Sequence, residues 1–161
     1  MRARVAVLVS GGGTNLQALI DAQTSGILKS GEIVLVVSSR PDAYALTRAK
    51  NAGVEAMTVT KADGETRLTE ALIARSIDLI VLAGYLTILS AGFVQRFENR
   101  IVNVHPSLIP AFSGKGFYGL IPHEEALKRG VKVTGATVHL VNEIPDGGRI
   151  LAQKAVDVLP G

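Results

Sequence analysis

Apolar, β-branched runs recur along the chain and alternate, in its first half, with segments of helical periodicity. Short apolar runs bounded by turn residues predict buried strands, and apolar residues at i, i+3 and i+4 predict amphipathic helices. The predicted strands are 5–9, 33–37, 54–59, 77–83, 101–104, 133–141 and 150–158. The predicted helices lie at about 15–23, 42–51, 64–75 and 122–129.

This order of elements predicts the fold class. Strands that alternate with helices are typical of parallel strands joined by crossover helices, so the first half predicts a doubly wound, mostly parallel α/β sheet. Thr14 and the pair Pro41-Asp42 are expected helix starts, and Gly130 is an expected helix end. The last two strands can pair antiparallel through the turn 143–148, because Pro145-Asp146-Gly147 is a turn sequence.

Composition narrows the class of protein. A chain of 161 residues without cysteine predicts one domain, 1–161, that needs no disulfide. No secretory signal and no apolar run of roughly 20 residues is present, so we expect a cytoplasmic protein without a membrane partner. The net charge of +3 comes from scattered Lys and Arg, and aromatic residues make up 4%, which argues against a nucleic-acid partner. This small positive net charge fits a small anionic ligand better than it fits a nucleic acid.

The stretch Ser10-Gly11-Gly12-Gly13-Thr14-Asn15-Leu16 joins the first predicted strand to the first helix. In a doubly wound sheet this turn lies at the carboxyl edge, where ligands bind, and the amides of a helix N-terminus can hold a phosphate. Gly13 allows close approach of the backbone, and the side chains of Thr14 and Asn15 can add donors. A tight turn that binds nothing is the alternative.

Two common nucleotides are excluded at this loop. The dinucleotide fingerprint requires a glycine where Leu16 stands, and no acidic residue follows the second strand, which ends in Ser38-Ser39-Arg40. A triphosphate-binding loop requires Gly-Lys followed by Ser or Thr, whereas Gly114-Lys115 is followed by Gly116. A single phosphate monoester is the ligand that remains.

A second group of polar residues lies in the other half of the chain. Asn103 and His105 are two apart at a strand end, so their side chains point the same way, and Asp146 lies in the later turn. A carboxylate near an imidazole favours its protonated form, and an amide can donate to an oxyanion. The trio suits acyl transfer to an amine, although a hydrogen-bonded strand end and an ordinary turn aspartate are the alternatives.

Other chemistry has little support in the sequence. Ser107 follows His105 closely, but no nucleophile elbow surrounds it, so a covalent intermediate is not expected. The three histidines, His105, His123 and His139, lack close ligand spacing, and we expect no metal.

Together these motifs resemble the phosphoribosylglycinamide formyltransferases, a family of folate-dependent enzymes of purine biosynthesis. The resemblance covers nearly the whole chain. It rests on the stretches 10–20, 81–90, 101–112 and 135–141 with 146–148, which come in the order of the family. The resemblance implies a Rossmann-like formyltransferase fold and transfer of a formyl group from the cosubstrate 10-formyltetrahydrofolate to the amine of 5-phosphoribosylglycinamide.

The resemblance also implies site residues, which are expected from matching positions alone. Asn103, His105 and Asp146 match the catalytic residues, and His139 matches a histidine near the site, where we expect it to have a supporting role. The ribonucleotide phosphate is expected at Gly13, Thr14 and Asn15. The folate is expected to contact the backbone of Leu86, Thr87, Ile88 and Leu89, together with Asn103.

The chain departs from the family in two places. Leu86-Thr87 stands where the family usually has Met-Arg, so any role of that arginine side chain is lost. Family members continue beyond Gly161 with a helical segment that contacts the ribonucleotide, and we expect the 1–161 domain to lack it. Bacterial-type relatives can pair, so a homodimer is among the expected states.

Three alternative functions can be compared with this one, and the opening glycine-rich loop argues against the first two. Formyltetrahydrofolate hydrolases share the Asn-x-His and Asp-Gly elements but lack the glycine-rich loop. The formyltransferases that act on initiator methionyl-tRNA need a basic carboxy-terminal domain. A non-catalytic module that binds a nucleotide or folate would bind a ligand without turnover.

Overall fold

The computed structural model describes residues 1–161, which form two compact units, residues 1–89 and residues 90–161. The helices and strands of each unit pack mainly on one another. The expectation of a single formyltransferase domain over 1–161 stays a prediction.

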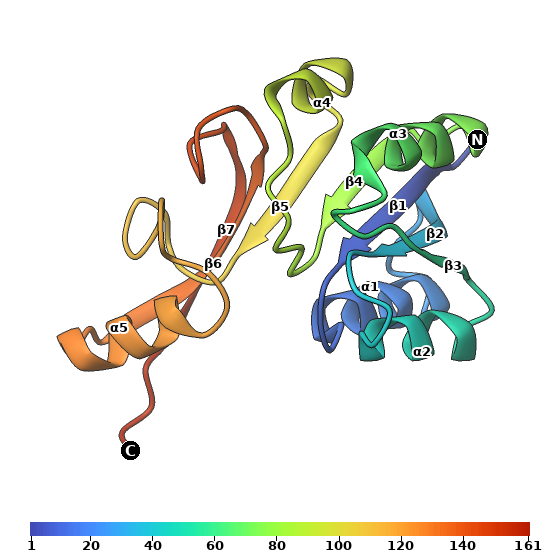
Figure 1. Ribbon diagram of the computed structural model, residues 1–161. Helices are drawn as coiled ribbons and strands as arrows, with labels where there is room; N and C mark the ends of the chain where they lie inside the picture. Colours follow the sequence, from blue (N-terminus) through green and yellow to red (C-terminus); the bar gives the residue numbers. More distant parts are fainter. The chain divides into compact units, whose positions relative to one another are not determined.

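The first unit is a parallel sheet covered by helices on both faces. Its strands stand in the order β3-β2-β1-β4 and are β1 (Ala3–Val9), β2 (Gly31–Ser38), β3 (Glu55–Thr58) and β4 (Leu79–Leu82). Helices α1 (Thr14–Thr24) and α2 (Tyr44–Asn51) lie on one face, and α3 (Gly64–Ala74) lies on the other (Figure 1). This is the doubly wound arrangement that the sequence predicts.

Burial and chain handedness together explain this arrangement. Strand β1 is buried from Val5 to Val9, as expected for a strand with helices on both sides. Right-handed crossovers carry the chain from β1 through β2 to β3 with α1 and α2 on one face. The return from β3 to the far side of β1 then places α3 on the opposite face. Leu16 of α1 and Leu72 of α3 are fully buried.

Two of the expected helix starts are not capped as the sequence suggests. The N-cap of α1 is Gly13 and that of α2 is Ala43, and neither makes a side-chain cap hydrogen bond. Asp42 precedes the N-cap Ala43 and pairs with Arg40, two residues earlier, at 2.9 Å. Gly130, in contrast, ends its helix in the left-handed conformation at φ 77°, as predicted.

The second unit carries the antiparallel strands. Strand β6 (Val133–Leu140) pairs with both β5 (Ile101–His105) and β7 (Ile150–Asp157), and the helices are α4 (Ala91–Arg96) and α5 (Ile121–Arg129). The antiparallel pairing of the last two strands is therefore confirmed. Helix α4 was not predicted, because its six residues are too few to show a period. It starts where the Ser90 hydroxyl accepts a hydrogen bond from the Phe93 amide.

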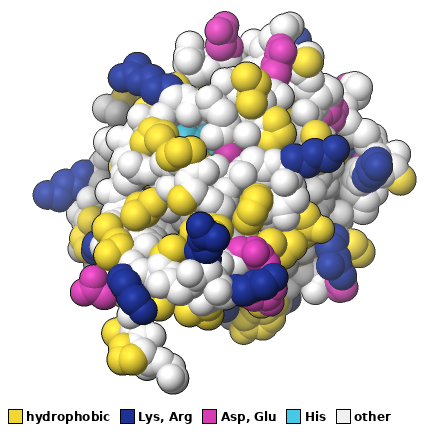
Figure 2. All heavy atoms as spheres, turned by 90° about the vertical axis from the view of Figure 1, so that its left-hand side faces the viewer, with side chains coloured by type: hydrophobic (Ala, Val, Ile, Leu, Met, Phe, Trp, Pro, Cys, Tyr) yellow, Lys and Arg dark blue, Asp and Glu magenta, His cyan; other side chains and the backbone are white.

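The surface is mixed in character. All eight residues of β7 are exposed, including Ile150, Leu151 and Val156. Figure 2 shows hydrophobic side chains on one face among Lys and Arg side chains that are spread singly and do not form a continuous stripe. None of the helices has the length and hydrophobicity that crossing a bilayer requires.

Candidate active site

The glycine-rich loop of the first unit follows β1 directly and is pressed against α2. Gly13 has φ 77°, and a Cβ atom built there would lie 2.6 Å from the Cβ and 2.9 Å from the Cα of Ala45. Such contacts are far too short, so only glycine fits at this position. Gly11 and Gly12, in contrast, have open space where a Cβ would be.

The carbonyl groups of this loop are all hydrogen-bonded within the unit. The Gly11 carbonyl accepts from the Ala45 amide (3.1 Å), that of Gly12 accepts from Arg48 Nε (2.7 Å), and that of Gly13 accepts from the Gln17 amide (2.9 Å). Because no side chain caps α1, its first N–H groups are not satisfied by the helix itself. Thr14 and Asn15 are exposed beside them, so this end of α1 has the donors that bind an anion.

The segment from Leu86 to Leu89 leaves β4 without regular structure. The side chains of Leu86 and Ile88 are exposed, at 58% and 92%. The backbone is nevertheless anchored, because the Leu86 amide donates to Ser10 Oγ at 2.9 Å. Burial raises the pKa of the Tyr85 phenol, although its hydrogen bond with Thr87 acts in the opposite direction.

Four polar residues come together in the second unit. Asn103 and His105 project from β5 on the same face, and β6 places His139 directly opposite Asn103. His105 and His139 are only 3% and 2% exposed. Asp146 Oδ1 lies 3.5 Å from His105 Nδ1 and 3.6 Å from His139 Nε2. The structure therefore brings together all the residues of this unit that the sequence nominated as catalytic or supporting.

The hydrogen bonds of His139 indicate how it acts on Asn103. His139 Nδ1 lies 2.9 Å from the Leu140 carbonyl, which can only accept, so this nitrogen carries a hydrogen. In a neutral ring Nε2 is then an acceptor, and it lies 3.2 Å from Asn103 Nδ2. With a neutral ring, His139 orients the Asn103 amide and leaves its second N–H group for another partner, while Asp146 Oδ1 lies 3.6 Å from the same Nε2.

His105 has an acceptor at each ring nitrogen. Nε2 lies 2.8 Å from the Phe112 carbonyl, and Nδ1 faces the Asp146 carboxylate. Only the imidazolium form carries hydrogens on both nitrogens, so it is the form that satisfies both neighbours. In that form the imidazole would lie on the same face of β5 as the Asn103 amide and have a donor at each ring nitrogen.

The turn that carries Asp146 has a backbone that requires its glycines. Asp146 itself has φ 52°. A Cβ on Gly147 would lie 2.6 Å from Ile144 Cγ2, and one on Gly148 would lie 1.6 Å from the Leu140 carbonyl oxygen. The sequence Asp146-Gly147-Gly148 is therefore a requirement of this geometry as well as a turn signal.

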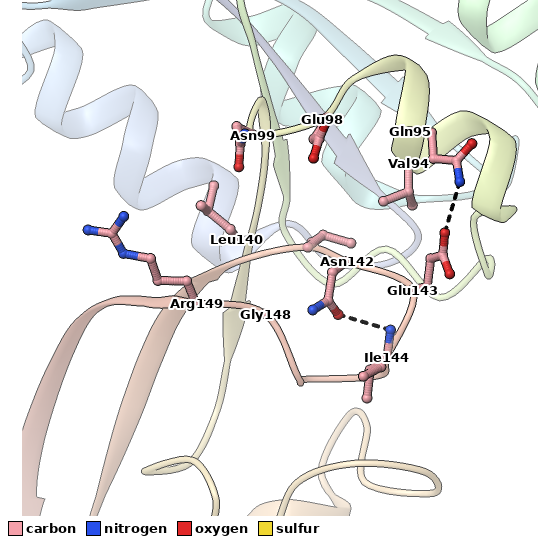
Figure 3. A pocket seen from close by; sticks show the side chains of 11 residues that line it. Val94, Gln95, Glu98, Asn99, Leu140, Asn142, Glu143, Ile144, Gly148 and Arg149 are labelled. Carbon is pink, nitrogen blue, oxygen red and sulfur yellow. Dashed lines mark hydrogen bonds between the residues drawn. The ribbon is translucent and has the colours of Figure 1, made fainter.

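The same turn forms one wall of a cavity of about 420 Å³ in the second unit (Figure 3). Asn142, Glu143 and Ile144 line it from the turn, and Val94 and Gln95 line it from α4. Glu143 accepts a hydrogen bond from Gln95 at 3.2 Å, which links the two walls. No group of three or more His, Asp or Glu side chains is arranged to hold a metal ion.

Backbone groups of the loop after β5 complete the cluster, and sequence reasoning missed them. The Phe112 carbonyl contacts His105, and the Gly114 amide donates to Asp146 Oδ2 at 2.8 Å. Ser107 is fully buried, and its hydroxyl donates to the Ala111 carbonyl at 2.6 Å, so it has a structural role and is not a nucleophile. Backbone contacts of this kind leave no residue-type signal in the sequence.

The α/β fold, its glycine loop and the Asn103-His105-Asp146 cluster together fit a protein that catalyses acyl transfer. The chain belongs to the formyl transferase family, whose model, described as "Formyl transferase", matches residues 3–161.

Individual relatives make the likeness more specific. The chain is 41% identical to a phosphoribosylglycinamide formyltransferase of Haemophilus influenzae, over 98% of this chain and 74% of that protein. It resembles the crystal structure of glycinamide ribonucleotide transformylase 1 from Symbiobacterium toebii with a TM-score of 0.89 and 43% identity, over 99% of this chain and 75% of that one. The α/β class with antiparallel strands near the C-terminus is thus shared with that structure.

A more distant likeness bears on the hydrolase alternative. The structure of a formyltetrahydrofolate deformylase from Pseudomonas syringae has a TM-score of 0.85 but 26% identity, over 98% of this chain and 52% of that one. The transformylase is thus the nearer of these two structures in sequence. The chain spans 12% and 56% of the length of the first two curated relatives it matches, so in neither case does it account for the whole protein.

Proposed function

We propose that this chain transfers a formyl group from 10-formyltetrahydrofolate to the amine of 5-phosphoribosylglycinamide, a step of purine biosynthesis. The observation that carries the proposal is the cluster of Asn103, His105, His139 and Asp146, in which both histidines are buried. Membership of the formyl transferase family and the names of the relatives above support it.

The cluster suits the charge that develops during this reaction. Attack of the amine on the formyl carbon produces a tetrahedral adduct with a negative oxygen, which needs hydrogen-bond donors. The Asn103 N–H that His139 does not use is one donor, and the Nε2–H of protonated His105 is the other. For His105 to donate, the oxyanion replaces the Phe112 carbonyl as the acceptor of this hydrogen bond.

The proton balance of the reaction gives Asp146 its role. The amine loses a proton, the bond from the formyl carbon to N10 of the folate breaks, and N10 gains a proton. The His105–Asp146 pair, with its atoms 3.5 Å apart, is the titratable pair that can carry this proton. Asp146 keeps the imidazolium in place, so we assign it an orienting and electrostatic role.

The first unit supplies the proposed binding segments. The ribonucleotide phosphate is held by the amides at the start of α1, with Gly13, Thr14 and Asn15 as its contacts. The folate contacts the backbone of the Leu86–Leu89 segment. The exposed side chains of Leu86 and Ile88 leave this segment accessible to a ligand.

Hydrolysis of the formyl folate is the second candidate function, because the same cluster would stabilise attack by water and a deformylase shares the fold. The two functions differ in the acceptor. A transferase releases tetrahydrofolate only when 5-phosphoribosylglycinamide is present, whereas a hydrolase releases formate without it.

The test is an assay of the purified chain with both substrates and with the folate alone. We expect transfer to the amine and no formate without the acceptor. His105→Ala should abolish transfer, while His123→Ala, an exposed histidine of α5 outside the cluster, should retain it. Near-normal transfer by His105→Ala would refute the mechanism, and ligand binding without turnover would favour the non-catalytic module.

A further inference from the structure

Ser10 is a buried hydroxyl at the end of β1 that the proposed mechanism does not use. The residue is 3% exposed, and its Oγ accepts from the Leu86 amide at 2.9 Å. The same oxygen lies 2.6 Å from Ser39 Oγ, just past the end of β2. A serine oxygen has one hydrogen and two lone pairs, so both contacts can be satisfied together.

This hydroxyl joins the start of the glycine loop to the start of the segment 86–89. The glycine loop begins with the residue after Ser10, and the segment 86–89 begins at the amide that Ser10 binds. Packing does not hold the second segment at Leu86 or Ile88, because both side chains are exposed. A hydrogen bond to its backbone therefore sets where this segment begins.

Ser39 is in turn tied to the end of β1. The Ser39 amide donates to the Val9 carbonyl at 3.0 Å, which continues the pairing of β1 with β2. The Ser10 hydroxyl therefore contacts Ser39, which is fixed by the sheet, and it accepts the hydrogen bond from the Leu86 amide. In the sequence, Ser38-Ser39 was informative only because no acidic residue stands there. In the structure, the Ser39 hydroxyl is a hydrogen-bond partner of Ser10.

We propose that Ser10 is a positioning residue that couples the phosphate loop to the folate segment, so that binding of each substrate depends on its hydroxyl. The inference rests on the proposed function for the identity of the two ligands. It assigns no contact between Ser10 and either substrate. Loss of this one hydroxyl should therefore disturb the phosphate loop beside Ser10 and the folate segment that begins at Leu86, 76 residues later in the chain.

The kinetic test compares Ser10→Ala with Ser39→Ala, which keeps the oxygen that Leu86 needs. We expect Ser10→Ala to raise KM for both substrates about tenfold, because the loss leaves a part-buried amide without its acceptor. The value of kcat should change by less than about threefold, since the reacting side chains belong to the second unit. Ser39→Ala should change both KM values much less. Equal effects of the two variants, or an unchanged KM in Ser10→Ala, would overturn the proposal.

Amide hydrogen exchange tests the coupling independently of catalysis. In the unmodified chain, adding 5-phosphoribosylglycinamide should slow exchange in residues 11–15 and also at the Leu86 amide. In Ser10→Ala the Leu86 amide should exchange at least about tenfold faster and no longer respond to the ribonucleotide. Absence of formyl transfer would refute the proposed function alone, whereas an unaltered Leu86 amide in Ser10→Ala would refute the role of Ser10 even in an active enzyme.

Discussion

Replacement of Gly13 by alanine should destabilise the first unit through two separable effects. An L-residue at φ 77° pays a backbone penalty of about 1 to 2 kcal/mol. The added Cβ would also lie 2.6 Å from Ala45 Cβ and 2.9 Å from its Cα, and such overpacking costs about 1 to 3 kcal/mol. The two effects together predict a loss of about 2 to 5 kcal/mol in the free energy of unfolding.

Two other glycines of the first unit serve as matched controls. Gly26 has φ 79° with no atom within 4 Å of its Cβ position, so Gly26→Ala reports the backbone penalty alone. Gly12 has neither a positive φ nor a close neighbour, so Gly12→Ala should stay within about 0.5 kcal/mol of the unmodified chain. The difference between Gly13→Ala and Gly26→Ala then measures the contact with Ala45.

Urea and thermal unfolding of the four chains provide the measurement. For a chain of this size the predicted loss corresponds to a fall in melting temperature of roughly 4 to 20 °C. Ribonucleotide affinity should fall in Gly13→Ala beyond the effect of Gly26→Ala, because α2 can no longer pack on the loop. The reasoning is wrong if Gly13→Ala is as stable as Gly12→Ala.

Three further predictions follow from the cluster and from Tyr85. Asp146→Asn should lower kcat by about 10² to 10⁴ with little change in KM, and a loss below tenfold in steady-state kinetics would argue against its role. Gly148→Ala should lower both kcat and the melting temperature, because its Cβ would lie 1.6 Å from the Leu140 oxygen, whereas Gly92→Ala, with no neighbour closer than 3.9 Å, should not. Burial raises the pKa of Tyr85 above 10.0, so its phenol should ionise late in an ultraviolet titration. The contribution of the neutral Tyr85 phenol to the free energy of unfolding should be fully present below the pKa that the phenol has in the unfolded chain. It should be lost as pH rises through the pKa of the folded protein. Tyr85→Phe should remove this pH dependence.

The regular elements could be predicted because each leaves a local signature. Buried parallel strands are nearly continuous apolar runs, and residues 33–37 and 101–104 both lie within observed strands. Helix α4 escaped prediction because one and a half turns show no periodicity, and its start depends on a single Ser90 cap. The expected helix start at Pro41-Asp42 lies two residues too early, because α2 begins at Tyr44 after the N-cap Ala43.

Some features of the candidate site were readable from the chain alone. The spacing of Asn103 and His105 places both on one face of a strand, since strand side chains alternate with period two. Gly13 before α1 and the Asp-Gly-Gly turn mark positions where a backbone conformation or a close contact excludes other residues. These local rules, together with the family resemblance, were enough to nominate the catalytic residues.

Only the tertiary structure decided how those residues act. That His139 faces Asn103 depends on the register between β5 and β6, which no single segment encodes. The contacts of His105 with the Phe112 carbonyl and of Leu86 with Ser10 join backbone groups to side chains, and every residue type has the same backbone. Residue identity determined which chemistry is available, and long-range pairing determined which atoms face one another.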